Sequence, residues 1–435
     1  MEMVRFYTRT NRLYFTRHST DYLVHPHSRT GSLMTSDSAQ FNQSIDRKLD
    51  RILNDLDFIK NRTATYLGRN EALTYLADET PIFVNTDDLG CPLNFMNGGV
   101  YEEDYFRVFQ SFRTPNLPML DIGANLGVYS IRMASMRTSK IHAFEPIPRI
   151  RSLFARSIFL NGLSDRVNIH ACAVSDTDGK ANLSIPSGHA GGATLESGST
   201  GGNSVEVDVK CLDDLFNADF RCGLIKLDVE GHELHALRGM NKILARSPEA
   251  VLMFEKLAVD SGIEGELLSF FKGLGWSLFH IIDRRLLECD LAGFKSSGGY
   301  FIATRRVVVD RDGLERDFFH IYPSDLNLLE GALTDGAWRI NSPSGNGSVL
   351  LHGPYWWLPR GYYRVTIDGT MSSDFRLEIC EKFGYKVTEI ELKDGNLQVD
   401  FAVYRDLAKF EIVLRSLGEG PTTALLNKIT FRRLG

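Results

Sequence analysis

The stretch that decides the fold is Met119-Leu-Asp-Ile-Gly-Ala-Asn-Leu-Gly-Val-Tyr-Ser130. Apolar residues lead into Asp121, a turn with Gly123, Asn125 and Gly127 follows, and the next residues suit the start of a helix. A strand, a tight turn and a helix N-terminus in this order are how α/β proteins hold nucleotide-like ligands. Glycine permits this because a residue without Cβ lets the backbone approach a ligand closely.

The spacing D-x-G-x-N-x-G differs from the G-x-G-x-x-G of pyrophosphate binders. A carboxylate at the strand tip would repel a pyrophosphate and attract a cationic ligand, and S-adenosylmethionine carries an ammonium and a sulfonium. A second acid, Glu145, ends the next apolar strand and lies 24 residues beyond Asp121. An acid about 20 residues beyond the glycine turn can accept hydrogen bonds from the hydroxyls of an adenosine ribose. The alternative is a doubly wound domain with ordinary turn glycines and a capping acid.

A third motif is Leu224-Ile-Lys-Leu-Asp-Val-Glu-Gly-His-Glu233. Lys226, Asp228 and Glu230 share one face of the predicted strand because side chains alternate along a strand. An unpaired buried charge is costly, so this face either pairs Lys226 with a carboxylate or opens into a site. The two interpretations are compatible, and ligands of open α/β sheets bind at the carboxyl ends of strands.

These motifs, together with Phe144-Glu-Pro146 and Ala173-Val-Ser-Asp-Thr-Asp-Gly179, resemble the FkbM family of S-adenosylmethionine-dependent methyltransferases. The resemblance covers roughly Thr80 to Thr304, about half of the chain. It implies a Rossmann-like class I methyltransferase fold with a mostly parallel, seven-stranded sheet. It also implies O-methylation of a hydroxyl, often on a sugar or a polyketide.

The cofactor expected from these motifs is S-adenosyl-L-methionine. We expect four residues of the first motif to surround its methionine part, Glu145 to bind its ribose, and Ala173 and Val174 to flank its adenine. Asp176 is expected to accept a hydrogen bond from the adenine amino group. The four residues of the first motif are Asp121, Gly123, Asn125 and Gly127.

Methyl transfer to a hydroxyl requires alignment of the acceptor and removal of its proton. The candidate bases near the carboxyl ends of the strands are His232, Asp228, Glu230 and Glu255. His232 is the preferred base because histidine titrates near neutral pH, and a helix-start surface histidine is the alternative. Asp228 or Glu230 is expected to contact substrate beside Lys226, and Glu255 to orient it. No metal site is predicted, because His232 and His235 have no obvious third ligand.

Composition sets further limits. A length of 435 residues predicts at least two domains, and a net charge of −6 argues against a broad nucleic-acid-binding surface. The six cysteines form no C-x-x-C pair, which argues against a zinc or redox motif. No segment has the apolar length of a membrane span, and the N-terminus lacks the apolar region of a signal peptide. These features predict a cytoplasmic enzyme.

The chain divides into four regions. Residues 1–40 are predicted to be a disordered or extended arm, and 41–79 a helical segment. The apolar stripe from Ile45 to Ile59 favours either a helix packed on its own domain or a short coiled coil that joins a homodimer. Residues 80–304 form the methyltransferase domain, in which the loop 188–202 is either a lid or a solvated hairpin tip.

Residues 305–435 show short alternating strands and predict a β-sandwich or jelly-roll domain. Asp394-Gly395 predicts a hairpin turn. Trp356 and Trp357 lie in the aromatic segment His352–Tyr363 and suit either a carbohydrate-binding platform or core packing.

The sequence therefore predicts an S-adenosylmethionine-dependent O-methyltransferase that modifies a sugar hydroxyl of a surface polysaccharide or glycolipid. A polyketide-type small-molecule O-methyltransferase and a non-catalytic glycan-binding or scaffold protein are the alternatives. A nicotinamide-linked oxidoreductase is disfavoured by the glycine spacing and by the acid that precedes the loop.

Overall fold

The computed structural model describes residues 48, 52, 63–136, 139–195, 203–256, 262–306, 314–315, 318–342, 348–371, 374–381, 384–392, 397–404, 406–417 and 422–434. The predicted arm at 1–40 lies outside these residues, and so does the stripe from Ile45 to Ile59 apart from helical Ile52. The coiled coil and the homodimer contact therefore stay predictions. Among the described helices, none has the length and apolarity needed to cross a bilayer.

A small antiparallel sheet precedes the main domain. It consists of β1 (Thr65–Gly68), β2 (Glu71–Tyr75) and β3 (Pro81–Asn85). The helical segment predicted for 41–79 is therefore wrong from residue 65 onward. The backbone N–H of Phe83 donates to Ser157 Oγ at 3.0 Å, which ties this sheet to the main domain.

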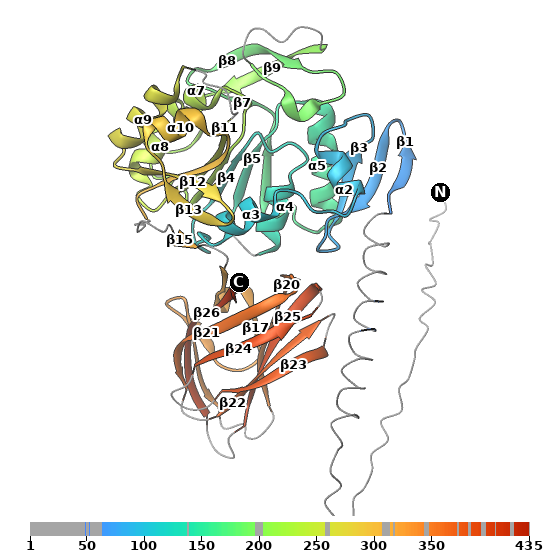
Figure 1. Cartoon of the computed structure of the whole chain (residues 1–435), viewed down its shortest axis with the longest axis vertical. Helices are drawn as coiled ribbons and strands as arrows, with labels where there is room; N and C mark the ends of the chain where they lie inside the picture. Colours follow the sequence, from blue (N-terminus) through green and yellow to red (C-terminus); the bar gives the residue numbers. More distant parts are fainter. Residues whose placement is uncertain are drawn as a thin grey trace, which may run out of the picture. The chain divides into compact units, whose positions relative to one another are not determined.

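A nine-stranded mixed sheet forms the centre of the main domain (Figure 1). Five neighbouring strands, β11, β10, β4, β5 and β6, are parallel, and β14, β12, β13 and β15 follow in antiparallel pairing. The predicted number of seven strands is wrong, because β13 and β15 extend the sheet beyond β12. The strands are β4 (Met119–Ile122), β5 (Ile141–Phe144), β6 (Val167–His170), β10 (Leu224–Leu227), β11 (Val251–Lys256), β12 (Ser277–Ile282), β13 (Arg285–Glu288), β14 (Gly299–Thr304) and β15 (Leu314–Glu315).

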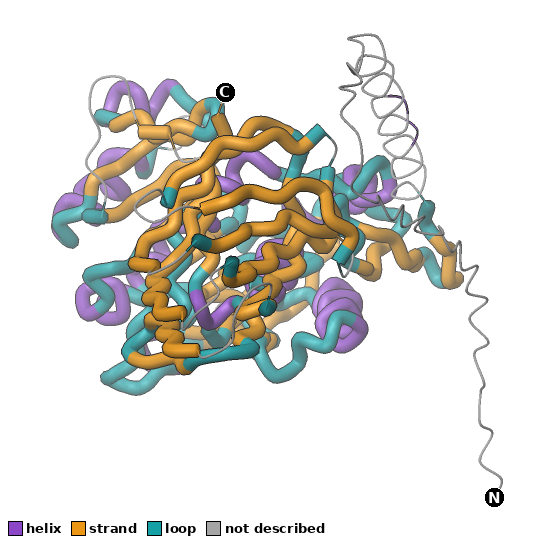
Figure 2. The backbone as a smooth tube through the Cα atoms, turned by 90° about the horizontal axis from the view of Figure 1, so that it is seen from below, coloured by secondary structure: helices purple, strands orange, loops and turns teal. Residues whose placement is uncertain are grey.

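Helices (purple in Figure 2) cover both faces of this sheet because its strands alternate apolar side chains between two cores. Met119 of β4 packs with residues of α3, α4 and α5, whereas Leu120 packs with residues of α7 to α10. The described helices are α2 (Cys91–Met96), α3 (Glu103–Gln110), α4 (Val128–Ser135), α5 (Pro148–Leu160), α6 (Leu212–Leu215), α7 (Glu233–Arg238), α8 (Asn241–Arg246), α9 (Glu264–Gly273) and α10 (Leu291–Ser296).

The register of the parallel strands brings the predicted site residues together. Lys226 of β10 lies opposite Asp121 of β4, and β10 and β11 run side by side in the same direction. The chain segments that follow β4 and β10 therefore leave the sheet at the same edge. Glu255 near the end of β11 lies opposite Tyr300 of antiparallel β14.

A three-stranded insertion follows β6. The strand predicted over Val167–Val174 divides into β6 and a separate β7 (Ala173–Val174), which pairs with β9. The strands β8 (Gly179–Ile185) and β9 (Asn203–Lys210) are antiparallel. Between them the 3₁₀ turn η1 (Ala190–Gly192) is described, whereas 196–202 of the predicted lid lies outside the described residues.

The C-terminal region forms two antiparallel sheets with one apolar core between them, as the strand pattern predicted. The predicted hairpin turn at Asp394-Gly395 lies outside the described residues, and the strands on its two sides, β23 and β24, belong to different sheets. One sheet contains β16 (Phe318–Ile321), β18 (Ala332–Thr334), β19 (Ala337–Ser342), β21 (Gly361–Met371), β24 (Gln398–Val403) and β26 (Thr422–Leu434). The other contains β17 (Asn327–Leu328), β20 (Val349–Leu358), β22 (Phe375–Glu381), β23 (Tyr385–Leu392) and β25 (Leu407–Ser416).

A buried ion pair joins the segment after α3 to the 3₁₀ turn η2 (Pro323–Asp325). Arg113 Nη1 donates to Asp325 Oδ1 at 3.1 Å, and the two side chains are 3% and 0% exposed. Asp325 Oδ2 also accepts the backbone N–H of Tyr322 at 2.7 Å. Because both charges are buried, each one depends on the other for compensation.

We predict that Arg113→Met destabilises the protein by about 3–5 kcal/mol, because it leaves the Asp325 carboxylate buried without its cation. The double variant Arg113→Met/Asp325→Asn removes that charge and keeps an acceptor for Tyr322, so it should unfold at higher denaturant than the single variant. Urea denaturation followed by circular dichroism measures both. Equal midpoints for the two variants would show that the buried charge carries no cost.

Candidate active site

The turn after β4 is held in a conformation that its glycines require. Gly123 and Gly127 have φ of +76° and +79°, and Asn125 between them has φ of +51°. A Cβ on Gly123 would come within 1.8 Å of the carbonyl oxygen of Asp228, and one on Gly127 would overlap the ring of Phe154. The turn is therefore packed directly against the segment that follows β10.

Glu145 connects the predicted second motif to this turn. Its carboxylate accepts the backbone N–H of Asn125 at 2.9 Å and that of Ile147 at 2.7 Å. The residue is 4% exposed, and burial raises the pKa of Glu145 to about 7. The two motifs that the sequence analysis placed at neighbouring strand tips are thus in direct contact.

Asp121 lies behind the turn rather than at its open side. Alternation along β4 directs its side chain toward α4, where Ser130 Oγ donates to Oδ2 at 2.6 Å. The residue has 0% exposure, and burial raises the pKa of Asp121. Its direct contact with a cofactor stays a prediction; in the structure it anchors the helix that follows the turn.

A cavity, called the first cavity here, opens between the turn, the end of β5 and the insertion. It includes five of the predicted cofactor residues and two of the predicted catalytic residues, whereas Asp121, Gly127 and Asp176 do not line it. Its walls are largely apolar apart from Asn125, Glu145, Asp228 and His232. The lining residues are Ile122, Gly123, Asn125, Phe144, Glu145, Pro146, Ile147, Ile150, Cys172, Ala173, Val174, Leu183, Ala190, Gly191, Ala193, Leu195, Asp228, Val229 and His232.

The two histidines that follow β10 contact the two residues that directly follow β7. His232 Nε2 lies 2.9 Å from Ser175 Oγ, and His235 Nδ1 lies 2.9 Å from Asp176 Oδ2. Hydrogen bonding to His235 lowers the pKa of Asp176. His232 therefore borders the first cavity, and Asp176 is engaged outside it.

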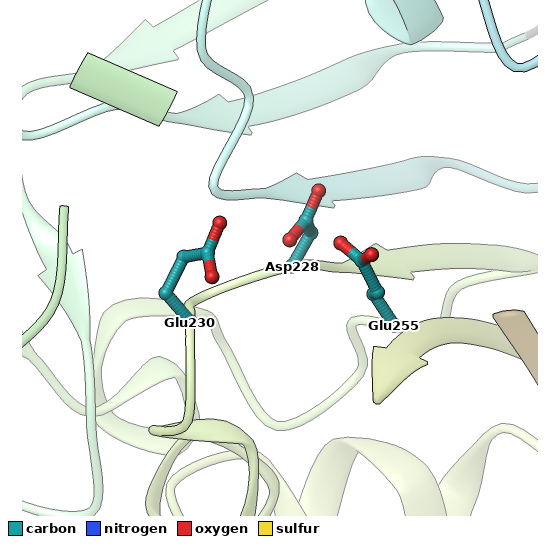
Figure 3. Close-up of side chains that lie close together, drawn as sticks. All are labelled: Asp228, Glu230 and Glu255. Carbon is teal, nitrogen blue, oxygen red and sulfur yellow. The ribbon is translucent and has the colours of Figure 1, made fainter. Parts of the chain in front are cut away.

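A second cavity, called the carboxylate cavity here, lies on the other side of Asp228. Asp228, Glu230 and Glu255 come from the end of β10, the following turn and the end of β11, and Figure 3 shows their carboxyl groups turned toward one another. Asp228 lines both cavities. The carboxylate cavity is lined by Asp228, Glu230, Gly231, Glu233, Phe254, Glu255, Lys256, Ile263, Glu264 and Leu267.

Lys226 connects two segments of the site by hydrogen bonds. Its Nζ donates to Asp228 Oδ2 at 2.9 Å and to the carbonyl oxygen of Gly123 at 3.2 Å, and the residue is 5% exposed. Burial opposes its charge, but the neighbouring carboxylates, Asp228 first, raise the pKa of Lys226. Lys226 is therefore paired with the carboxylate of Asp228, which was one of its two predicted roles. Contact of Lys226 with substrate stays a prediction.

The remaining carboxylates of the cluster are only partly compensated. Burial and then the charge of Asp228 raise the pKa of Glu255 to about 8 and that of Glu230 to about 7. Glu102, which the sequence analysis did not select, also faces this charge cluster, and burial raises its pKa. The hydroxyl of Tyr129 donates a hydrogen bond to Glu102 Oε2 at 3.0 Å. It precedes the first motif by 19 residues, so no motif spacing could identify it.

The two predicted tryptophans do not form an exposed platform. Trp356 is 6% exposed and packs in the core of the C-terminal domain, with the guanidinium of Arg113 5.1 Å from its ring centroid. Trp357 is half-buried beneath the guanidinium groups of Arg107 and Arg132. The core-packing interpretation describes Trp356, and glycan binding by either residue stays a prediction.

Comparison with known proteins finds a family match within the central domain. Residues 121–292 match the family described as the Methyltransferase FkbM domain, which confirms the resemblance seen in the motifs. These residues include the end of β4, the whole of β5, β10 and β11, and the carboxylates of both cavities.

Two curated relatives are fungal methyltransferases. "Methyltransferase 1" of Beauveria bassiana (strain ARSEF 2860) is 31% identical over 145 residues, which cover 28% of this chain and 58% of the relative. "Methyltransferase sdnD" of Sordaria araneosa is 28% identical over 163 residues, covering 29% of this chain and 63% of the relative. The chain thus spans about three fifths of the length of these relatives.

Among solved structures, the precorrin-6y C5,15-methyltransferase of Geobacter metallireducens GS-15 is 14% identical with a TM-score of 0.28. The match covers 46% of this chain and 86% of that one.

We predict that Gly123→Ala destabilises the protein by more than about 2 kcal/mol, because alanine is strained at positive φ and its Cβ would overlap the Asp228 carbonyl. Gly179→Ala is the matched control, since a Cβ there meets no atom within 4 Å. Urea denaturation of both variants measures the difference. Similar midpoints for the two would show that the close approach of the turn to Asp228 does not constrain residue 123.

Proposed function

We propose that this chain, whose residues 121–292 belong to the FkbM methyltransferase family, is an S-adenosylmethionine-dependent O-methyltransferase. The observation that carries the proposal is the position of Asp228. It lines the first cavity, which suits the cofactor, and the carboxylate cavity, which suits the acceptor. A methyl group held between the two cavities would lie beside this carboxylate.

The residues of the first cavity fit an adenosyl cofactor. Glu145 has four acceptor sites on its two oxygens and uses one on each for backbone N–H groups, so acceptors remain for two ribose hydroxyls. Apolar side chains such as Phe144 and Val174 suit a flat aromatic base. Gly123 and Asn125 line the first cavity, and Gly123 packs against the Asp228 carbonyl, so we place the methionine moiety beside these two residues.

The chemistry places simple demands on the protein. The bound cofactor supplies a methyl group on a sulfonium, which is already an activated leaving group. With this cofactor bound, the acceptor oxygen would form the new O–C bond as the methyl C–S bond breaks, and the acceptor proton would pass to a base of the chain. The residues of the chain therefore align the acceptor and remove its proton.

The carboxylates, rather than His232, are proposed to take that proton. His232 borders the first cavity and contacts Ser175, whereas it does not line the carboxylate cavity. A hydroxyl in the carboxylate cavity would face Asp228, Glu230 and Glu255. In this assignment His232 helps to position the cofactor. The proposed base is therefore one of the carboxylates, and not His232 as the sequence favoured.

The lining of the carboxylate cavity favours a polyhydroxylated acceptor, which is the sugar predicted from the sequence. Several hydroxyl donors of a sugar could be matched by carboxylate acceptors, whereas a polyketide-type acceptor would bury apolar surface. Among the described lining residues, Phe254, Ile263 and Leu267 supply apolar side chains to this cavity, beside the carboxyl groups of Asp228, Glu230 and Glu255. That the sugar belongs to a surface polysaccharide or glycolipid, and that the reaction takes place in the cytoplasm, stay predictions.

The acceptor is tested with methyl-labelled S-adenosylmethionine and a panel of free sugars, oligosaccharides and polyketides. We expect label to enter a sugar hydroxyl. Transfer to polyketides alone would refute the sugar assignment, and transfer to an amine would refute O-methylation.

We predict that Glu145→Ala weakens the binding of S-adenosylhomocysteine by roughly 10- to 100-fold, because a hydrogen bond to a charged group contributes about 1.5–3 kcal/mol. Isothermal titration calorimetry measures the affinity. Asp176→Ala is the matched control: its carboxylate contacts His235 outside the first cavity, so the affinity should stay near that of the wild type.

Circular dichroism must show both variants folded, since Glu145 also accepts two backbone N–H groups. Unchanged affinity of a folded Glu145→Ala variant would remove Glu145 from the cofactor site. If the wild type were stabilised by NAD and not by S-adenosylhomocysteine in a thermal shift assay, the methyltransferase proposal itself would fail.

A further inference from the structure

We propose that Asp228, Glu230 and Glu255 form a binding site for a hard divalent cation of the Mg²⁺ or Mn²⁺ type. The inference extends the proposed function, because the cation would lie where the acceptor hydroxyl is expected. It also departs from the sequence analysis, which predicted no metal site.

The geometry of the three side chains suits one shared ion. One carboxylate oxygen from each residue can be chosen so that all three atoms lie within 4.8 Å of one another. Figure 3 shows the carboxyl groups converging from the end of β10, the turn after it and the end of β11. Two of the three thus come from rigid neighbouring strands or their immediate ends, which keeps the ligand positions fixed.

A buried hydroxyl beside the cluster provides a second, independent observation. Tyr300 lies opposite Glu255 in the β11–β14 pairing and is 3% exposed. Its hydroxyl oxygen has no hydrogen-bond partner among the described residues, although Glu102 is close enough to interact with it. Burial, and then the charges of Asp228, Glu102 and Glu255 among others, raise the pKa of Tyr300, so its hydroxyl lies within electrostatic reach of the cluster. An ion-bound water or acceptor oxygen would give this buried group a partner.

Among the described residues, the lysines that lie near the cluster are already paired with carboxylates. Lys226 is paired with Asp228, and Lys256 lies 3.4 Å from Glu264. Within the described part of the chain, neither Glu230 nor Glu255 forms an ion pair. Carboxylates this close repel one another, and a divalent cation would compensate them.

The ligand type selects the class of ion. Carboxylate oxygens favour hard cations such as Mg²⁺, Mn²⁺ and Ca²⁺, whereas the cluster contains none of the sulfur or imidazole ligands typical of zinc sites. Three protein oxygens leave coordination positions for the acceptor hydroxyl and water. A cation bound to that hydroxyl lowers its pKa, and a carboxylate oxygen not used for coordination can take the proton.

The test is the binding of Mn²⁺ to the full-length protein, measured by the loss of the electron paramagnetic resonance signal of free Mn²⁺. We expect one Mn²⁺ per chain, displaced by excess Mg²⁺. Glu255→Gln and Glu230→Gln should each weaken binding by roughly tenfold or more, because each removes one charged ligand. Glu266→Gln is the control, since this carboxylate lies on the surface and pairs with Arg238.

Absence of Mn²⁺ binding by the wild type would overturn the proposal, and so would equal binding by the Glu266→Gln, Glu255→Gln and Glu230→Gln variants. Melting curves identify a variant that fails to fold, and the other glutamine variant then decides. S-adenosylhomocysteine binding is measured in parallel. Site-dependent Mn²⁺ binding without S-adenosylhomocysteine binding would support the metal site and refute the proposed function, whereas the reverse result would refute only the metal site.

Discussion

The buried ammonium of Lys226 is the interaction on which the rest of the site depends. It contacts the carboxylate of Asp228 and the carbonyl oxygen of Gly123, and so connects the ends of two neighbouring parallel strands. An ammonium that is 5% exposed requires both partners, because a buried charge without compensation is unstable. The position of Asp228 between two cavities follows from this contact.

Backbone packing reinforces the same connection. Gly123 lies so close to the Asp228 carbonyl that no side chain fits between them. Glu145 accepts one N–H group from the turn after β4 and one from the segment after β5. The wall of the first cavity is therefore built from segments that hold one another in place. Because this wall is already ordered, the protein loses less conformational entropy when a ligand binds.

The local parts of the site could be predicted from the sequence. The glycine turn and Glu145 were recognised because each motif is contiguous and its spacing reflects one strand–turn–helix unit. The side-chain direction of Asp121 was not, since the pattern places it at the strand tip but the alternation of β4 turns it toward Ser130. The three-carboxylate cluster was also missed as a unit, because Glu255 is 27 residues from Asp228 in sequence and meets it only through strand pairing.

Features that depend on residues far apart in the chain are harder to predict from the sequence. The nine strands of the large sheet exceed the predicted seven because β13 and β15 pair at its edge, a choice that depends on neighbours rather than on local pattern. Asp394-Gly395 has hairpin chemistry, yet the strands beside it join different sheets. Trp356 is in the core because opposing strands cover it, which an aromatic-rich segment alone does not reveal.

The proposed double role of Glu145 would limit how this fold can diversify. The carboxylate that we propose to bind the ribose also accepts the backbone N–H of Asn125 in the turn after β4 and that of Ile147 in the segment after β5. A substitution that altered ligand preference at this position would at the same time expose two main-chain donors. A descendant or an engineered variant with a different nucleoside preference would therefore first need another acceptor for those donors.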